Sequence, residues 1–495
     1  MPDDILASAR NAKQIDELHF DGKVAEFDYL GSAPKEIVDL TSAGVYSDVS
    51  ITVIPSNNLK SIVRKFKNLT LSIPSYMILD ITSCSVSDYT YDKNTGVVTM
   101  RNVSSSSPIY LKGVVKTLDF KKAANDENML KFTPVKNQDG SVVLKGVVKT
   151  GITINELNIT GTTVPTDLSL TANMSMDKIT INSAKGRFNP EIDLGELGSV
   201  DINDVPDFLN GDDVKINLYN PIIELTVNSN IGIAGKVKGK IIAEDKDKNT
   251  IASIDIVPEM DIKAHNGAQN TSTVTKICIC KYSNLVDNTK YDVVRQVDNL
   301  SDLMLTIPKS LRFEADVRAD DQKEAEIMLG TSYEIAPHYS ITAPLAFDEG
   351  AQIVYRDTLD GWHDDIDDYE FADGTYIELN ANIVNKMPAY LNVNAVAIDL
   401  NGNEIPDNRI KVEVSNSVKG CENASSPVTT PIKITIKENQ KGALKSVDGL
   451  IFKVEAAAGQ GSESIVGQTI NAYNHTLTAR DIKIKVVGRI IADLN

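Results

Sequence analysis

The densest group of side chains that could do chemistry lies between Asp357 and Asp373, in the run DTLDGWHDDIDDYEFAD. Calcium takes about six to eight hard oxygen ligands, so carboxylates this close together could bind a Ca²⁺ ion. The run lacks the ligand spacing and the turning glycine of an EF-hand, and charge runs are usually solvated. A calcium site and a solvated acidic loop therefore both remain open. The predicted ligands of a calcium site are Asp364, Asp365, Asp367 and Asp368.

The same run holds three aromatic residues that could contact a glycan or a partner protein. They are Trp362, which is the only tryptophan of the chain, Tyr369 and Phe371. Aromatic side chains dominate binding hot spots because they bury large apolar surfaces. In the alternative interpretation, Ile366 and Tyr369 pack a short helix or turn onto a sheet. This run is the one candidate site that the sequence offers.

Motifs of the common enzyme classes are absent from the sequence. It contains no G-x-S-x-G, H-E-x-x-H or C-x-x-C motif, and its five histidines are scattered singly. The segment 235–240 has one residue too few between its glycines for a phosphate-binding loop. We therefore predict a protein that is not an enzyme and has no cofactor, Ca²⁺ being the one exception considered. A glycosidase stays open, because it needs only two carboxylates that folding brings together.

Two short acidic runs resemble the beginning of a calcium loop. They are DKDKN at 245–249 and DLNGN at 399–403; the first lacks the glycine of such a loop, and both lack its closing glutamate. Asp and Asn side chains cap turns by accepting hydrogen bonds from backbone groups nearby. Since each run lies between β-prone segments, we predict hairpin turns at both places.

Charge and composition limit the partners that the protein can have. The net charge is −18, and an acidic surface repels phosphate backbones, so we predict no nucleic-acid binding. Four scattered cysteines do not make a disulfide framework, and Cys278 and Cys280 are interpreted as small buried hydrophobic residues. No apolar run is long enough to span a bilayer, so no transmembrane segment is predicted.

Alternation of apolar and polar residues is the main secondary-structure signal. Apolar side chains occupy every second position in several segments, and turn signals such as Asn401-Gly402 fall between them. This pattern predicts antiparallel strands that are half buried, and a fold that is mainly β. The clearest examples are the segments 311–318, 377–383, 432–437 and 482–486.

An internal sequence repeat predicts two related modules in tandem. The stretch 291–308 repeats the apolar positions of 57–74, ending in Leu-x-Ile-Pro both times, at an offset of 234 residues. Apolar residues at helical spacing precede that ending, so we predict one amphipathic helix per module. Each module is either a sandwich or a tubular sheet wrapped on its helix, and the whole is elongated. The predicted division is a tether at 1–19, a larger module at 20–265 and a second module at 270–495.

The texture of the sequence resembles that of a group of bacterial proteins. The D-x-N-G-N-x-I turn at 399–405, the ending KIKVVGRIIADLN and the wealth of Asn and Thr are similar to exported β-rich proteins of gut Bacteroidetes, many of them uncharacterised. Such proteins are often lipoproteins of the cell envelope. The resemblance implies export to the periplasm or to the outer-membrane surface, with the N-terminal segment as the tether. It implies no functional residue.

Three hypotheses of function follow from the sequence. The first is a non-enzymatic cell-envelope protein for binding, adhesion or surface assembly, because duplication occurs here without a catalytic motif. The second is a carrier of a lipid or another apolar ligand in a tubular β fold, by analogy of fold alone. The third is a carbohydrate-active or glycan-binding accessory protein that uses the segment 357–373. The partner is accordingly an envelope protein, an apolar ligand or a glycan.

Overall fold

The computed structural model describes residues 18–122, 127–154, 168–192, 197–202, 216–267, 271–366, 369–460, 463–470 and 473–491. Strands dominate these residues and nearly all pair antiparallel, which confirms the mainly β class. The α-helices of the described part are α2 (Asn57–Ile62) and α3 (His363–Ile366). Neither has the length that crossing a membrane requires, nor has any other helix described here. The 3₁₀-helices are η2 (Ser283–Leu285), η3 (Asn288–Lys290), η4 (Leu300–Met304) and η5 (Ala443–Ser446).

The first core lies between two sheets, so this part of the chain is a sandwich. One sheet has the order β1-β9-β3-β6-β5 with β8 beside β9, and the other has the order β19-β11-β2-β7-β4 with β10 beside β2. Phe66, Leu69 and Leu71 of β3 share one buried cluster with Ile51 of β2. The strands are β1 (Leu18–Ala33), β2 (Ile37–Pro55), β3 (Lys65–Ser72), β4 (Met77–Cys84), β5 (Tyr89–Asp92), β6 (Val97–Ser104), β7 (Ile109–Asp119), β8 (Met129–Val135), β9 (Gln138–Ile154), β10 (Leu170–Met176), β11 (Thr180–Phe188) and β19 (Ala325–Met328).

The second core also lies between two sheets, ordered β12-β18-β14-β15 and β17-β16-β13-β20. The boundary predicted between residues 265 and 270 falls inside this core, because β16 after it pairs with β13 before it. Cys278 and Cys280 of β16 are both fully buried, as their interpretation as small hydrophobic residues requires. The strands are β12 (Ser199–Asp201), β13 (Ile222–Ser229), β14 (Gly235–Glu244), β15 (Thr250–Ile262), β16 (Thr273–Cys280), β17 (Val293–Gln296), β18 (Ser310–Ala319) and β20 (Ile335–Thr342).

The third core is enclosed by a three-stranded sheet, β21-β27-β24, and a four-stranded sheet, β25-β26-β23-β30. Two small two-stranded pairs, β22-β31 and β28-β29, accompany them. The strands are β21 (Gln352–Leu359), β22 (Glu370–Phe371), β23 (Tyr376–Asn385), β24 (Tyr390–Ile398), β25 (Ile410–Val414), β26 (Val428–Glu438), β27 (Gly449–Ala457), β28 (Gly459–Gln460), β29 (Glu463–Ser464), β30 (Leu477–Val487) and β31 (Ile490–Ile491).

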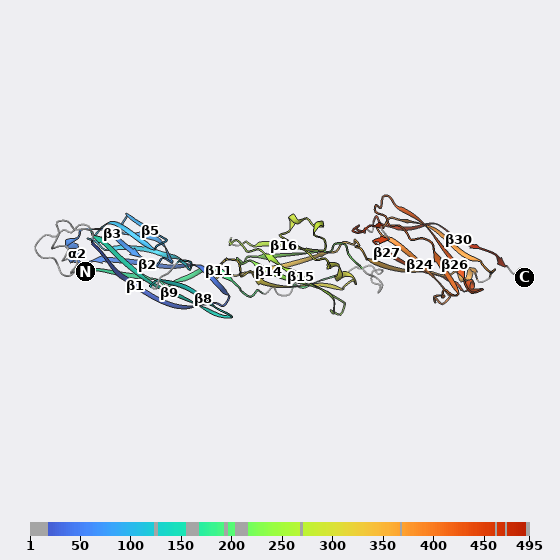
Figure 1. Ribbon diagram of the computed structural model, residues 1–495, viewed down its shortest axis with the longest axis horizontal. Coiled ribbons are helices and arrows are strands. Elements are labelled where there is room, and N and C mark those ends of the chain that lie inside the picture. The colour runs from blue at the N-terminus through green and yellow to red at the C-terminus, as the bar shows by residue number, and fades with distance from the viewer. Residues whose placement is uncertain are drawn as a thin grey trace.

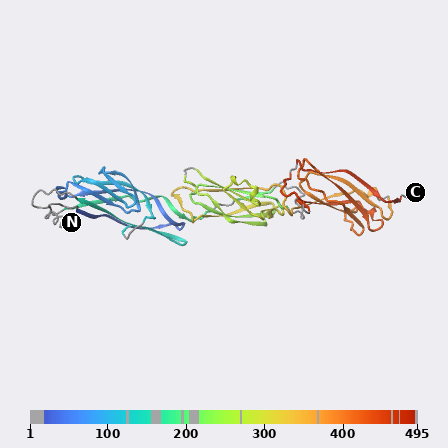
Figure 2. The ribbon, with the colours of Figure 1, turned by 45° about the horizontal axis from the view of Figure 1, so that its top comes forward.

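The three sandwiches follow one another in a row along the longest axis of the molecule (Figure 1). The second view shows the same row, with the N-terminal end and the C-terminal end at opposite extremes (Figure 2). The elongated shape agrees with the prediction. The tubular alternative needs a long amphipathic helix in each module, whereas the longer described α-helix, α2, has six residues.

The predicted helix at 291–308 is wrong. Its residues form the strand β17, which pairs parallel with β16, and then the 3₁₀-helix η4. In the earlier copy, the corresponding residues form α2 and β3, and Ser56 caps α2 by accepting a hydrogen bond from the Leu59 backbone amide. Similar apolar positions thus fold differently, because an apolar stripe can be buried by a strand or by a helix.

Both predicted hairpin turns are present. Asp245 Oδ1 accepts hydrogen bonds from the backbone amides of Asp247 and Asn249, each at 2.8 Å. Asp399 Oδ1 accepts them from Asn401 and Asn403, each at 2.9 Å. In both places the aspartate caps the turn, as its ability to bond backbone groups predicts. The first turn joins the paired strands β14 and β15, and the second leads from β24 to a single bridge between Ile398 and Glu404.

The first and second sandwiches are joined by a shared sheet. Strand β19 follows β18 of the second sandwich in the sequence but pairs with β11 in a sheet of the first. Glu324, just before β19, accepts a hydrogen bond from Thr41 and forms ion pairs with Lys121 at 3.2 Å and Lys185 at 3.3 Å. These contacts lower the pKa of Glu324 to about 2. The connection is thus held by backbone pairing and by charge.

The second and third sandwiches are joined by a buried ion pair. Lys281 Nζ lies 2.6 Å from Asp348 Oδ2, and the Tyr282 hydroxyl donates to the same carboxylate at 2.6 Å. Lys281 also donates to Ser301 Oγ at 2.9 Å and to Asn217 Oδ1 at 3.2 Å. Burial opposes ionisation of Asp348, but the hydrogen bonds from Lys281 and Tyr282 prevail and lower its pKa. The hydrogen bond to Asp348 raises the pKa of Tyr282 to about 12.

Candidate binding groove

The third sandwich is closed along one side and open along the other. On the closed side, β24 and β25 contact each other, and Leu391 of β24 bridges to Val418. On the open side lie β21 and β30, which are the edge strands of the two sheets. Among the described strands, β21 pairs only with β27, and β30 pairs only with β23. Both edges therefore present unpaired backbone groups toward the same opening.

The inner face of β30 is apolar but poorly covered. Ile484 lies opposite Leu379 and Val486 lies opposite Ile377, so both extend the core-facing side of the sheet. Yet Ile484 is 58% exposed and Ile482 is 59% exposed, whereas Leu379 is buried. The three-stranded sheet has one strand fewer than the four-stranded sheet to which β30 belongs, which accounts for the missing cover. The predicted half-buried strand is present, but its apolar face is largely in solvent.

A bulge in β30 keeps its apolar residues on one face. The register shifts between Asn380 and Asn382 of β23, and Asp481 takes a positive φ of 53° there. An extra residue in one strand changes which side chains point inward beyond it. Leu477 and Ala479 before the bulge and Ile482 after it consequently line the same cavity. The bulge is what makes β30 a continuous apolar surface.

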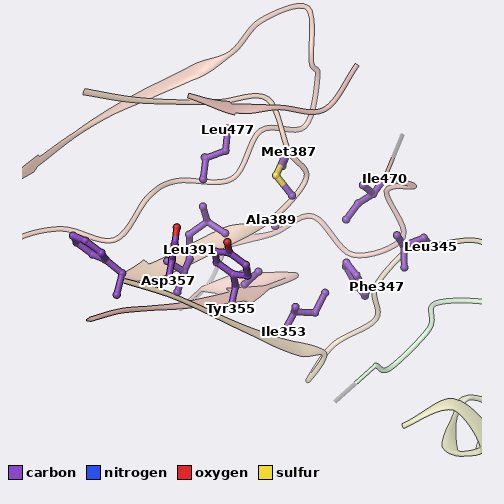
Figure 3. A pocket seen from close by; sticks show the side chains of 13 residues that line it. Leu345, Phe347, Ile353, Tyr355, Asp357, Met387, Ala389, Leu391, Ile470 and Leu477 are labelled. Carbon is purple, nitrogen blue, oxygen red and sulfur yellow. The ribbon is translucent and has the colours of Figure 1, made fainter. Parts of the chain in front are cut away.

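Two adjoining cavities occupy the space between the sheets, with volumes of about 430 Å³ and about 260 Å³. Both are lined almost entirely by apolar side chains, and they share Leu391, Phe452, Val454 and Leu477. Figure 3 shows the larger one, with Tyr355 and Asp357 on one side and Leu477 across from them. We call this combined space, together with the inner faces of β21 and β30 that border it, the groove. Its larger part has the size of small-molecule sites in proteins.

The inner face of β21 forms the opposite wall of the groove. Ile353, Tyr355 and Asp357 line the larger cavity and Leu359 lines the smaller one. Tyr355 is 49% exposed and Leu359 is 46% exposed, so this wall is incompletely covered, like that of β30. Among the described residues that line the two cavities, Asp357 is the one carboxylate. It belongs to the acidic run that the sequence singled out.

Charges on the outer face hold β30 in place. Glu378 of β23 forms an ion pair with Lys485 at 2.7 Å and another with Lys433 of β26. Hydrogen bonds from Lys433, Lys485 and Asn380 lower the pKa of Glu378 to about 2. Arg480 and Lys483 of β30 are exposed, and within the described part of the chain neither forms an ion pair. The open edge is therefore locally cationic on a chain whose net charge is −18.

Two of the four carboxylates predicted as calcium ligands lie in α3, the short helix that follows β21 in the sequence. Asp364 and Asp365 are exposed residues of α3, and Asp367 and Asp368 lie outside the described residues. No group of three or more His, Cys, Asp or Glu in the described ranges has the arrangement of a metal site. The calcium site remains a prediction, since half of its ligand set falls where the structure gives no description.

The three predicted aromatic residues do not share one exposed surface. Phe371 is buried in the third core, and Trp362 packs partly buried against that core. The Trp362 backbone amide donates to the Asp448 carbonyl at 2.8 Å, which fixes the start of α3. Tyr369 is 43% exposed. The alternative interpretation has Ile366 and Tyr369 pack this run onto the sheet. Ile366 does pack, partly buried, against the third core, whereas Tyr369 does not.

Sequence reasoning missed the groove itself. Its signal was present in the final strand, where Ile482, Ile484 and Val486 alternate with Lys483 and Lys485. Alternation predicts a strand with an apolar face, but a solvent-exposed apolar face has the same pattern as a buried one. Only the sheet widths and the pairing of β21 reveal that this face lacks a cover.

Comparisons with known proteins give distant similarity only. No family model matches the chain, and no curated protein matches it. A presumed secreted protein of Parabacteroides distasonis is 15% identical, over 62% of this chain and 90% of its own, with a TM-score of 0.38. The T13 particle of infectious bursal disease virus matches at 8% identity over 89% of this chain and 75% of that one, and its Gx strain at 7% over 89% and 80%, both with a TM-score of 0.16. Scores this low carry no argument, so function is argued from the chain's own geometry.

Proposed function

We propose that this is a non-enzymatic binding protein of the cell envelope whose binding site is the groove of the third sandwich. The observation that carries the proposal is the apolar inner face of β30, where Ile482 and Ile484 are more than half exposed. Exposed contiguous apolar surface is costly for a soluble protein and typically marks an interaction site. Export to the periplasm or the outer-membrane surface, with the segment 1–19 as tether, is part of this proposal.

The row of sandwiches supports a role in binding at a distance from the N-terminal end. The groove lies in the sandwich at the C-terminal end of the row, opposite the N-terminal end (Figure 1). The shared sheet at β19 and the buried Lys281–Asp348 pair join the sandwiches through specific contacts. A tether at one end and a binding groove at the other is an arrangement that suits adhesion or surface assembly.

Binding of an apolar dye tests this proposal directly. We expect bis-ANS fluorescence to rise on the full chain and to fall several-fold in Ile484→Asp and in Leu359→Asp, because a charge in the groove disfavours an apolar ligand. A matched control is Ile251→Asp, which changes an apolar residue of β15 that is 43% exposed and lies far from the groove. Equal dye binding by wild type and both groove variants would show that the groove is not a binding site.

A second candidate function is the transport of a small apolar ligand. The observation that favours it is the volume of about 430 Å³ with a nearly all-apolar lining. Native mass spectrometry of the purified full chain tests it, because a carrier retains a bound lipid whose mass adds to that of the protein. A bare protein mass, unchanged after incubation with detergent-free phospholipid vesicles, would exclude this function.

A further inference from the structure

The groove is bordered by two edge strands with space for a further strand between them, and this indicates which kind of ligand it binds. Its two long borders are the edge strands β30, with 11 residues, and β21, with 8. Each has backbone N–H and C=O groups along its free side, and such groups are the usual template for a further strand. A lipid tail offers no hydrogen bonds to these groups. A polypeptide in an extended conformation can satisfy them along the whole edge.

The inner face of the groove prescribes one half of the partner's sequence. A strand added beside β30 lies about 4.8 Å from it, and every second side chain then points into the sandwich. Those side chains would cover Ile482 and Ile484 and meet Tyr355 and Leu359 across the groove, all of which are 46% to 59% exposed. Apolar residues at alternate positions are what this surface accommodates.

The outer face of β30 indicates which residues the partner strand carries at its outward-pointing positions. Lys483 lies opposite Asn380 and Lys485 opposite Glu378, so both cations lie on the side of the sheet away from the core. Glu378 pairs with Lys485, whereas Lys483 forms no ion pair within the described residues. Oppositely charged residues directly across a strand pair are stabilising, and like charges are destabilising. Acidic residues at the outward positions therefore complement β30.

The same charges disfavour a second copy of β30 as the occupant. Two copies of this strand paired edge to edge would bring Arg480, Lys483 and Lys485 of one chain near those of the other, with Asp481 as the one acidic residue of each strand. We therefore propose that the groove binds a strand of a different polypeptide in which apolar residues alternate with Asp or Glu, added to β30 and facing β21. This inference rests on the proposed function of the groove as a binding site.

Binding of designed peptides to the full chain tests the inference. The probe is a fluorescein-labelled peptide of 11 residues, the length of β30, in which valine alternates with glutamate. A second peptide alternates valine with lysine, and a third carries proline at two central positions of the acidic sequence. We expect fluorescence anisotropy to show binding of the acidic peptide at least tenfold tighter than binding of either other peptide, because proline removes backbone donors and lysine faces cations.

Substitutions in the groove and on its rim separate shape from charge. Ile484→Asp and Leu359→Asp should each weaken the acidic peptide at least tenfold, and Ile251→Asp should leave it unchanged. Lys483→Glu should weaken the acidic peptide and strengthen the lysine peptide, a reversal that a merely structural role of Lys483 would not produce. Hydrogen exchange should show new protection of the β30 amides when the acidic peptide is bound.

The outcomes distinguish the inference from the function on which it rests. If bis-ANS binding depends on Ile484 but no peptide binds, the inference of a partner strand is wrong. The groove then remains a site for small apolar ligands. Peptide binding without charge preference, or without protection of β30, also overturns the inference. If bis-ANS binds Ile484→Asp as well as it binds wild type, the proposed function itself is overturned.

Discussion

Removing the Asp348 carboxylate measures how firmly the second and third sandwiches are joined. Asp348 is 6% exposed and Lys281 is 8% exposed, so their ion pair is shielded from water. In Asp348→Asn, Lys281 keeps its charge but loses its counter-ion. Breaking a buried pair in this way costs about 3–5 kcal/mol, because an uncompensated charge is left in the interior. Ser301 and Asn217 still accept hydrogen bonds from Lys281, so its charge is partly compensated. We therefore expect a cost at the lower end of this range, about 3 kcal/mol.

Hydrogen exchange at the junction is the assay that reports this cost. The backbone amide of Asp348 donates to the Asn217 carbonyl, and that of Tyr219 donates to the Ala346 carbonyl, both at 2.8 Å. A loss of about 3 kcal/mol corresponds to roughly a hundredfold lower protection of these amides, since 1.4 kcal/mol is a factor of ten. Protection of β3 in the distant first sandwich should not change.

Two further variants test whether the ion pair between Lys281 and Asp348 is what holds the junction. Asp357→Asn removes an exposed carboxylate close in sequence and should leave junction protection unchanged. The double variant Lys281→Met with Asp348→Leu replaces the pair by apolar groups, which is often neutral or stabilising, so protection should return toward that of wild type. If Asp348→Asn stays within about twofold of wild type, or the double variant is as weak as the single one, the ion pair does not hold the junction.

Three further predictions concern single residues. The pKa of Glu324 is lowered to about 2. Its stabilisation of the β19–β11 pairing is therefore complete above about pH 4.5 and is lost as the pH falls toward 2. Glu324→Gln should abolish this pH dependence, as measured by hydrogen exchange of the β19 amides. The pKa of Glu378 is lowered to the same value, so protection of the β30 amides should decline over the same acidic range, and Glu378→Gln should weaken it already at pH 7. Gly96→Ala should destabilise its sandwich more than Gly402→Ala destabilises its own, since both glycines have a φ of 74° but only at Gly96 would a Cβ lie 2.1 Å from a backbone oxygen, that of Ile73. Thermal unfolding followed by circular dichroism compares the two.

Each of these predictions has an outcome that contradicts it. Unchanged exchange of β19 in wild type between pH 6 and pH 3 would mean that the Glu324 contacts do not stabilise the pairing. For Glu378, the control is Glu404→Gln, which alters an exposed glutamate of the same sandwich and should not affect β30. Equal losses of stability in Gly96→Ala and Gly402→Ala would indicate that only the backbone angle, and not the close approach to Ile73, matters.

Local patterns in the sequence were enough for the class of the fold and for several turns. The alternation at 377–383 and 432–437 predicts strands that form as β23 and β26, because side chains of a strand point alternately to its two faces. The runs at 245–249 and 399–403 predict turns, since Asp bonds backbone amides only two and four residues away. Such interactions are local and need no knowledge of the rest of the chain.

Longer-range inferences from the same patterns failed for a physical reason. The apolar stripe of 291–308 fits a helix by its spacing, yet Val293 pairs with β16 as part of a strand and packs partly buried against the second core. The boundary predicted near residue 265 followed from polar composition, which describes a surface loop as well as a linker between domains. Which segments pair is a tertiary property that composition does not contain.

Alternation and charge are properties of neighbouring residues, so they were sufficient to predict a series of half-buried antiparallel strands on an acidic protein without common catalytic motifs. The sequence also singled out the acidic run 357–373, whose first residue, Asp357, lies on the groove wall. The groove itself could be recognised only from the folded arrangement of the two sheets. Its existence depends on the difference in width between two sheets and on β21 and β30 both being edges, and strand order is fixed by pairing between residues that lie far apart in the chain.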